Sequence, residues 1–263
     1  MKYENVMLGS DPEMVLYDPR KKRFHSVEGL IGGTKEEPRP IEGFDGFFVQ
    51  EDNLAVEGNI SPAKSSEEFA DSIDILKKQI VLMIPEYSLR IVPSAVFDKE
   101  FLDTDQAREF GCQPDMNAYS GEMNPLACVP KDNLGLRSFG GHIHISYDDA
   151  WLDEKEDKQA IARAMDIYTG LPSLLEDEDK MRRELYGAAG SYREKEYGLE
   201  YRSLSNYWVK SKELSKTIFE RTIKALAFVT DMGITHNDTR VQKAINTHDV
   251  DLAEKLILEY GVA

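Results

Sequence analysis

The stretch Gly141-His142-Ile143-His144-Ile145-Ser146 places two imidazoles at positions i and i+2 of a strand-like run, and Leu199-Glu200-Tyr201-Arg202-Ser203 places a carboxylate and a guanidinium at the same spacing. Side chains two residues apart on a strand lie on the same face of its sheet. Imidazole and carboxylate groups bind divalent metals, and arginine suits phosphate or carboxylate. The two stretches therefore predict strands that build a site for a metal and a nucleotide.

The composition is that of a soluble, globular protein with room for a substantial core. Of the 263 residues, 41% are hydrophobic and 30% are charged. No apolar run is long enough to cross a membrane, and the N-terminus lacks the apolar stretch of a signal peptide, so we expect a cytoplasmic protein. The formal net charge of −16 opposes non-specific binding to nucleic acid. Cys112 and Cys128 are the only cysteines and suggest no disulfide framework.

Predicted strands and helices follow one another without regular alternation, which favours the α+β class with a mostly antiparallel sheet. Alternating or apolar runs predict strands at residues 6–17, 44–49, 54–60, 89–97, 139–147 and 197–207. The polar Glu51-Asp52-Asn53 is the expected hairpin turn between the second and third of these strands. Residues 98–137 show no clear period, and we expect this long segment to cover or line a site.

Helices are predicted after residue 64 and throughout the C-terminal part of the chain. Ser65-Ser66-Glu67-Glu68 resembles a helix start, and an apolar stripe continues from it as far as Pro85. From Ser211 onward the apolar spacing is helical. No repeat or linker divides the chain, so we expect a single domain, 1–263, whose helical C-terminal portion is 211–263.

Three acidic residues of the N-terminal part are candidate metal ligands. Asp11 and Glu13 share one strand face, where two carboxylates repel each other unless a cation lies between them. The alternative is an edge strand that turns these acids to water, with Pro12 blocking a neighbour. Glu57 interrupts the apolar positions of a strand, and its alternative is a solvated hairpin.

His142 and His144 are two of only five histidines, and the Gly140-Gly141 pair before them permits close approach of a ligand. This pattern favours a ligand role over the alternative of one buried and one exposed histidine. Metal-dependent hydrolases also use a His-x-His strand, so the motif alone does not name the reaction.

Glu200 and Arg202 could form a simple ion pair, which is worth little on a surface. Further arginines nearby, Arg182, Arg183 and Arg193, instead favour a clamp for phosphate and carboxylate groups. The chain has no Walker A sequence and no Gly-x-Gly-x-x-Gly, which argues against a P-loop or a dinucleotide-binding fold.

Taken in order, these motifs resemble the glutamine synthetase-like carboxylate–amine ligases, and most of all the phage-type COOH–NH2 ligase (type 2) family. Residues 9–18 are similar to the acidic strand that opens the glutamine synthetase catalytic domain, with Asp11 in place of the usual first glutamate. Residues 141–146 resemble its Gly-x-His-x-His-x-Ser strand, and 199–202 its Glu-x-Arg strand. The resemblance spans roughly 6–208, and the glutamate–cysteine ligases are more distant.

The resemblance implies a curved sheet with helices on one face, and it implies a metal site. Glu13 and Glu57 would hold one magnesium, with Mn²⁺ as a substitute. Asp11, His142 and Glu200 would hold another.

The resemblance also implies the groups that handle phosphate and substrate. His144 would lie near the nucleotide phosphates. Arg182 and Arg193 would contact the transferred phosphate, and Arg183 could exchange roles with Arg182. Arg202 would grip the substrate carboxylate.

The predicted function is an ATP-dependent carboxylate–amine ligase that forms an amide through an acyl phosphate with Mg-ATP. Glu51 or Asp52 is the expected acceptor of the amine's proton. The expected partners are a small-molecule or peptide carboxylate and amine, in the cytosol of a phage or bacterial host. No membrane partner is expected, and a homo-oligomer is compatible with the sequence.

Two other functions stay open. One is a zinc hydrolase built on His142 and His144, although His25, His236 and His248 fall in segments that offer little as a third nitrogen ligand. The other is a non-catalytic relative that binds a nucleotide.

Overall fold

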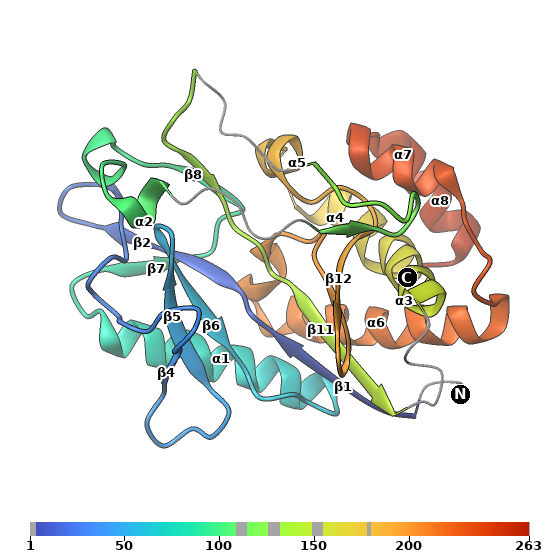
Figure 1. The fold of residues 1–263 in the computed structure, drawn as a ribbon, viewed down its shortest axis with the longest axis horizontal. Coiled ribbons are helices and arrows are strands. Elements are labelled where there is room, and N and C mark those ends of the chain that lie inside the picture. Colours follow the sequence, from blue (N-terminus) through green and yellow to red (C-terminus); the bar gives the residue numbers. More distant parts are fainter. Residues whose placement is uncertain (1–3, 109–114, 126–131, 149–154, 178–179, 263) are drawn as a thin grey trace.

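The computed structural model describes residues 4–108, 115–125, 132–148, 155–177 and 180–262. Within these ranges it confirms the α+β class: antiparallel strands form curved sheets, and helices pack along them (Figure 1). Cys112 and Cys128 lie outside the described residues, and so does the side chain of Arg183.

The strands are β1 (Glu4–Ser10), β2 (Glu13–Asp18), β3 (Arg23–His25), β4 (Arg39–Pro40), β5 (Phe48–Asp52), β6 (Ala55–Asn59), β7 (Ser88–Arg90), β8 (Ser94–Val96), β9 (Met116–Asn117), β10 (Leu136–Ser138), β11 (Ile143–Asp148), β12 (Ser191–Lys195) and β13 (Gly198–Tyr201). The α-helices are α1 (Ser66–Met83), α2 (Asp105–Arg108), α3 (Lys155–Met165), α4 (Leu171–Glu176), α5 (Met181–Leu185), α6 (Lys212–Met232), α7 (Thr239–Thr247) and α8 (Val250–Tyr260). Two 3-10 turns, η1 (Lys99–Phe101) and η3 (Asn206–Lys210), and a π-helical turn, η2 (Asp166–Gly170), complete the described elements.

Two sheets meet at the N-terminal strands. One has the order β1-β11-β13-β12-β9, and the other has the order β3-β2-β6-β5-β4 with β7 also paired to β2. The chain steps from the first sheet to the second at Asp11-Pro12, where proline cannot donate a ladder bond. Strand β6 continues across this step, because the Gly58 N–H donates to the Pro12 carbonyl and the Ile60 N–H donates to the Ser10 carbonyl, each at 3.2 Å.

Helices α1, α3 and α6 pack against one side of this curved surface, as Figure 1 shows for α1 and α6. Helix α1 begins as predicted, with the Ser65 hydroxyl accepting the Glu68 N–H at 3.2 Å. The stripe that it buries completely is Phe69, Ile73, Leu76 and Ile80. Burial of each such side chain contributes about 1.5–3 kcal/mol, so this stripe holds the helix on the sheet.

Apolar and polar residues alternate along β11 and β13, so that the apolar side chains face the core and the polar ones face the opposite side of the sheet. Ile143 and Ile145 of β11 and Leu199 of β13 are fully buried in the core under the helices. His144 lies between the two isoleucines in sequence, and Glu200 follows Leu199. His144 and Glu200 are direct partners across the β11–β13 ladder. They therefore project together from the face that the helices leave uncovered.

The β5–β6 hairpin turns later than the sequence predicted. Glu51 and Asp52 are the last residues of β5, and the turn is Asn53-Leu54. Asn53 adopts a left-handed φ of 54°, which asparagine tolerates better than most residues.

Three predicted strands are shorter than expected. Residues 89–97 are divided into β7 and β8 around Pro93, 139–147 becomes a strand only at Ile143, and 197–207 leaves the strand conformation after Tyr201. The Gly140-Gly141 pair instead packs closely, since a Cβ at Gly141 would lie 2.6 Å from the Trp208 indole nitrogen.

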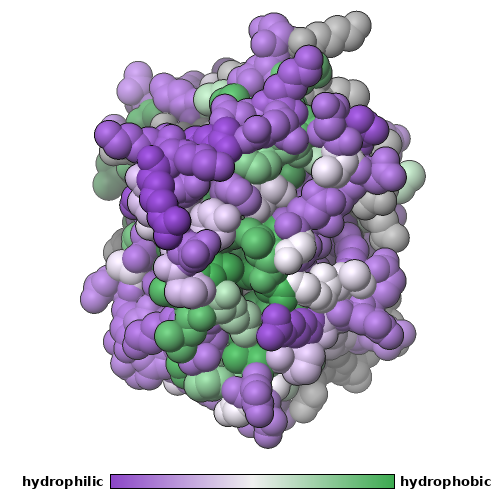
Figure 2. Space-filling view, turned by 90° about the vertical axis from the view of Figure 1, so that its left-hand side faces the viewer, coloured by the Kyte–Doolittle hydropathy of each residue, from purple (hydrophilic) through white to green (hydrophobic). Residues whose placement is uncertain are grey.

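The surface carries the charge that the composition implies. The face in Figure 2 is hydrophilic around one apolar strip. None of the helices in the described part of the chain is long and apolar enough to span a membrane.

Candidate active site

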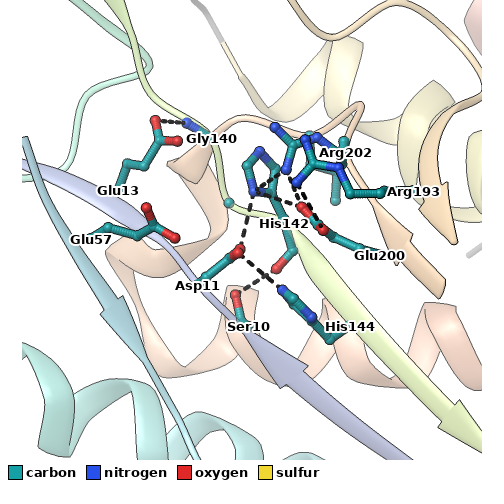
Figure 3. A network of polar contacts seen from close by, with 12 residues as sticks. Ser10, Asp11, Glu13, Glu57, Gly140, His142, His144, Arg193, Glu200 and Arg202 are labelled. Carbon is teal, nitrogen blue, oxygen red and sulfur yellow. Dashed lines mark hydrogen bonds and ion pairs between the residues drawn. The ribbon is translucent and has the colours of Figure 1, made fainter. Parts of the chain in front are cut away.

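The two central motifs meet the N-terminal acids on the uncovered face of the sheet (Figure 3). Asp11, at the step between β1 and β2, lies between the two histidines. Its Oδ1 is 3.1 Å from His142 Nδ1, and its Oδ2 is 3.0 Å from His144 Nε2. His142 Nδ1 is also 3.5 Å from Glu200 Oε1. Asp11, His142 and Glu200, which were predicted to hold one ion, thus lie together, with His144 next to Asp11.

The local charges stabilise ionised acids at the centre of this cluster. Burial alone would raise the pKa of Asp11, but the charges of His144 and His142 hold that pKa well below its usual range. Burial and Asp11 also oppose ionisation of Glu200, yet Arg202 and the histidines keep the Glu200 pKa at about 2. The pKa of His144 is raised, because the effect of Asp11 exceeds that of burial.

Glu13 and Glu57 form a second acidic pair next to this cluster. They are direct partners across the β2–β6 ladder, so their side chains leave the sheet on the same face. Burial raises the pKa of both, and Asp52 adds to the effect on each of them. Glu13 accepts the Gly140 N–H at 2.8 Å. Two half-buried carboxylates on neighbouring strands form a place where a divalent cation would relieve repulsion.

Arg202 is buried among acids and imidazole at the end of β13. Its Nε lies 2.7 Å from Asp115 Oδ1, and its Nη1 contacts Glu200 and lies 3.2 Å from His142 Nδ1. The Arg202 guanidinium therefore lies in the site, where it is paired with Asp115 and Glu200.

The other predicted arginines lie on two sides of Arg202. Arg193 is the ladder partner of Glu200, and its Nη1 is 3.5 Å from Glu200 Oε2. Arg182 is buried and donates to the Leu204 carbonyl at 3.0 Å.

Glu51 has a different environment from the other predicted acids. Its Oε1 accepts the N–H groups of Ile31 and Gly32 at 3.0 and 2.8 Å, and its Oε2 accepts the Gly29 N–H at 2.9 Å. These bonds fasten the 29–32 loop. Its role as proton acceptor stays a prediction, and so does that of the neighbouring Asp52.

Several residues of the site were not singled out in the sequence prediction, among them Lys35, Gln50, Asp115, Lys195 and Tyr197. Lys195 follows Arg193 at i+2 on β12, the same spacing that marked the histidines, and its Nζ is 3.0 Å from Glu200 Oε2. Asp115 lacks such a spacing, but the segment 98–137 that contains it was expected to line a site, and Gln106, Asp115 and Arg137 of that segment do line a pocket.

Two adjoining pockets open onto these groups. One, of about 510 Å³, is lined by Arg182 and Tyr186 together with Gln106, Asp115 and Arg137 of the 98–137 segment. The other, of about 500 Å³, is lined by Glu57, His144 and further residues. Both are of a size that holds a small ligand. Their shared lining is Glu13, Lys35, Asp52, His142 and Arg202.

The donor set fits a divalent cation. Ligand atoms of Asp11, His144 and Glu200 all lie within 4.8 Å of one another. Oxygen and imidazole nitrogen together suit Mn²⁺ or Mg²⁺ when carboxylates dominate, and carboxylates dominate here. Two of the other three histidines are engaged elsewhere: His25 Nδ1 lies 2.7 Å from the Ser26 carbonyl, and His236 Nε2 lies 3.0 Å from the Tyr260 hydroxyl.

Fold and site together define an α+β protein with buried carboxylates, imidazoles and guanidinium groups converging on one sheet face. Residues 134–251 match the family described as phage phiEco32-like COOH.NH2 ligase-type 2. The matched family is the one that the motifs predicted, and its description is that of a carboxylate–amine ligase. A search of curated proteins found no match. Asp11, Glu13 and Glu57 lie outside the matched segment, and His142, His144, Glu200 and Arg202 lie within it.

Proposed function

We propose that the protein is an ATP-dependent ligase that joins a carboxylate to an amine through an acyl phosphate, with magnesium bound by the buried acids. The observation that carries the proposal is the convergence of Asp11, Glu13, Glu57 and Glu200 with Arg202 around the common edge of two pockets. Two pockets of this size give two reactants separate places that meet at the charged groups.

The acids would serve as metal ligands. One divalent ion would be held by Glu13 and Glu57, and another by Asp11, Glu200 and a histidine. When bound, such an ion supplies positive charge to phosphate oxygens. The energetic cost of keeping the acids buried and close together is then offset in the loaded enzyme.

The cationic side chains complete the reaction chemistry. The carboxylate oxygen of the first substrate attacks the γ-phosphorus of ATP, which breaks the bond to the β-phosphate oxygen and releases ADP. Arg182 and Arg193 would stabilise charge on the transferred group, and a single well-placed donor of this kind is often worth about 3 kcal/mol. Arg202 would orient the substrate carboxylate. Orientation by Arg202 requires that Asp115, now 2.7 Å from its Nε, shares the guanidinium with the substrate or moves from it.

The second step forms the amide. The amine nitrogen attacks the acyl carbon, phosphate leaves, and the amine gives up a proton. Asp52 is the better placed of the two predicted acceptors, because it lines both pockets while Glu51 is bonded to the 29–32 loop.

The test measures ADP formation by the full chain with Mg²⁺ and a panel of amino acids, dicarboxylic acids and short peptides as carboxylates. Hydroxylamine serves as the amine, because it converts an acyl phosphate into a hydroxamate that is detected by colour with iron(III). We expect ADP and hydroxamate in equal amounts, both dependent on Mg²⁺ and on the carboxylate.

Glu13→Gln is the matched variant, since it removes one charge and keeps the size of the side chain. A folded Glu13→Gln protein with full turnover would contradict the proposed site. Hydrolysis of esters or peptides without nucleotide, together with tightly held zinc, would instead support the hydrolase.

A further inference from the structure

We propose that Lys35 is a catalytic residue, whose ammonium group contacts the phosphoryl group as it passes from the nucleotide to the carboxylate. In that step the bond from the γ-phosphorus to the β-phosphate oxygen breaks and a bond from the carboxylate oxygen forms, and Lys35 supplies charge without giving up a proton. The inference rests on the proposed function, because it needs a nucleotide and a carboxylate in adjoining pockets. Lys35 lies outside the segment that matches the family, 134–251.

Lys35 lines both pockets, so it lies where they meet. With reactants in separate pockets, the phosphoryl group is what has to cross this junction. Besides His142, the cationic side chains of the shared lining are Lys35 and Arg202. Arg202 is already paired with Asp115 and Glu200. In the described part of the chain, by contrast, no hydrogen bond or ion pair engages the exposed Lys35 side chain, so its charge is available to an anion.

The lysine and arginines that line only one of the pockets are engaged within the protein. Arg193 and Lys195 contact Glu200, at 3.5 and 3.0 Å. Arg182 donates to a backbone carbonyl, and Arg137 donates to the Asn53 side chain and to three backbone carbonyls. A phosphoryl group would have to share these side chains with their present partners, whereas it would meet the full charge of Lys35.

The loop that carries Lys35 is fastened to β5 by bonds on both sides of Glu51. The Glu51 carboxylate accepts three N–H groups of this loop, and its backbone N–H donates to the Gly33 carbonyl at 3.2 Å. Gly33 has a φ of +83°, and a Cβ there would lie 2.5 Å from a carbonyl oxygen of β5. On the other side of Lys35, the Thr34 hydroxyl accepts the Glu37 N–H at 3.2 Å. The backbone is thus held over the pockets, while the flexible four-carbon stem can follow the moving phosphoryl group.

The first test measures hydroxamate formation by Lys35→Met, which keeps most of the stem and removes the charge. We expect kcat to fall at least about 100-fold, as for the loss of one well-placed donor, with the KM of the carboxylate unchanged. Lys35→Arg restores the charge and should recover at least about a tenth of the turnover. Lys78→Met is the matched control, because Lys78 is also exposed but lies on α1, outside both pocket linings, and it should keep full turnover.

The second test measures binding without turnover, by titration calorimetry of the full chain with Mg²⁺ and either ADP or adenylyl imidodiphosphate. Only the imidodiphosphate carries a group in the place of the γ-phosphate. We expect Lys35→Met to bind it about tenfold more weakly, as for the loss of one charge-assisted hydrogen bond, and to bind ADP as the unmodified protein does.

These measurements separate the role of Lys35 from the proposed function. Full kcat of Lys35→Met, a raised KM of the carboxylate at unchanged kcat, or equal losses of affinity for ADP and the imidodiphosphate would overturn the inference and leave the ligase intact. An unmodified protein that binds no nucleotide and forms no ADP would overturn the proposed function, and the inference with it.

Discussion

Glu57 is a half-buried carboxylate whose surroundings disfavour its charge. Burial, Asp11, Asp52 and Glu13 all raise its pKa, and the Gln50 side-chain amide, which donates to it at 3.0 Å, offsets this only in part. A side chain that costs stability in the folded protein is expected where a ligand later compensates that cost. Glu51, next to the same turn, is the reverse case, since three backbone N–H groups donate to it.

The substitution Glu57→Gln should therefore stabilise the metal-free protein. We expect its free energy of unfolding in urea to rise by about 1 kcal/mol, because a carboxylate crowded by Asp11, Asp52 and Glu13 is replaced by an amide without loss of volume. Glu51→Gln is the matched control and should lower the same quantity by about 1 kcal/mol, since it weakens bonds to backbone donors. A Glu57→Gln protein less stable than the unmodified one would contradict this account of the site.

Arg202→Lys tests whether the buried guanidinium takes part in the reaction. Lysine keeps the charge but cannot contact Asp115, Glu200 and His142 at once, so ADP formation should fall at least about 100-fold. Arg221→Lys is the control, because Arg221 is also buried and paired, with Glu176 outside the site. Turnover should survive in the control; full turnover of a folded Arg202→Lys protein would refute the role of Arg202.

At the scale of elements, short-range patterns predicted which segments alternate and where helices begin, as Ser65 and Ser211 show with their capping bonds. These patterns did not predict the residues at which a strand stops pairing with its neighbour. The break at Pro93 and the turn at Asn53 depend on which neighbours donate to the backbone, and a single segment does not carry that information. Asp115 was missed for the same reason: its contact with Arg202 joins two segments without shared periodicity.

The start of α7 gives a pH-dependent prediction at the scale of one element. Hydrogen bonds from Arg240 and Tyr260 lower the pKa of Asp238 from 3.8 to about 2. A lowered pKa in the folded state stabilises the protein above the unfolded value, and this contribution is lost as the pH falls toward 2. Asp238→Asn should therefore lower the free energy of unfolding by about 1–2 kcal/mol at pH 6, and by clearly less at pH 3.

Asp249→Asn separates this effect from helix capping. Asp249 caps α8 by accepting the Leu252 N–H at 3.0 Å, and asparagine caps as well as aspartate. Its cost should be only a few tenths of a kcal/mol. An Asp238→Asn cost that stays constant from pH 6 to pH 3 in urea unfolding would contradict the ion-pair explanation.

At the scale of the whole molecule, the site exists because distant segments are neighbours in the sheets. Strand β1 leads to Asp11, β2 and β6 carry Glu13 and Glu57, and β11 and β13 carry His144 and Glu200. The ladder register aligns His144 with Glu200 and Glu200 with Arg193. The sequence motifs predicted which residues would converge, while the register that decides their contacts required the fold. The single domain over 1–263 stays a prediction.

The most direct measurement is a crystal structure of the full chain soaked with Mn²⁺ and a non-hydrolysable ATP analogue, with Mn²⁺ located by anomalous scattering. We predict Mn²⁺ in contact with Glu13 and Glu57, and with Asp11 and Glu200, and the analogue's phosphates against the same ions. Mn²⁺ and nucleotide bound away from these four carboxylates, or no ordered Mn²⁺ at saturating concentration, would contradict the account.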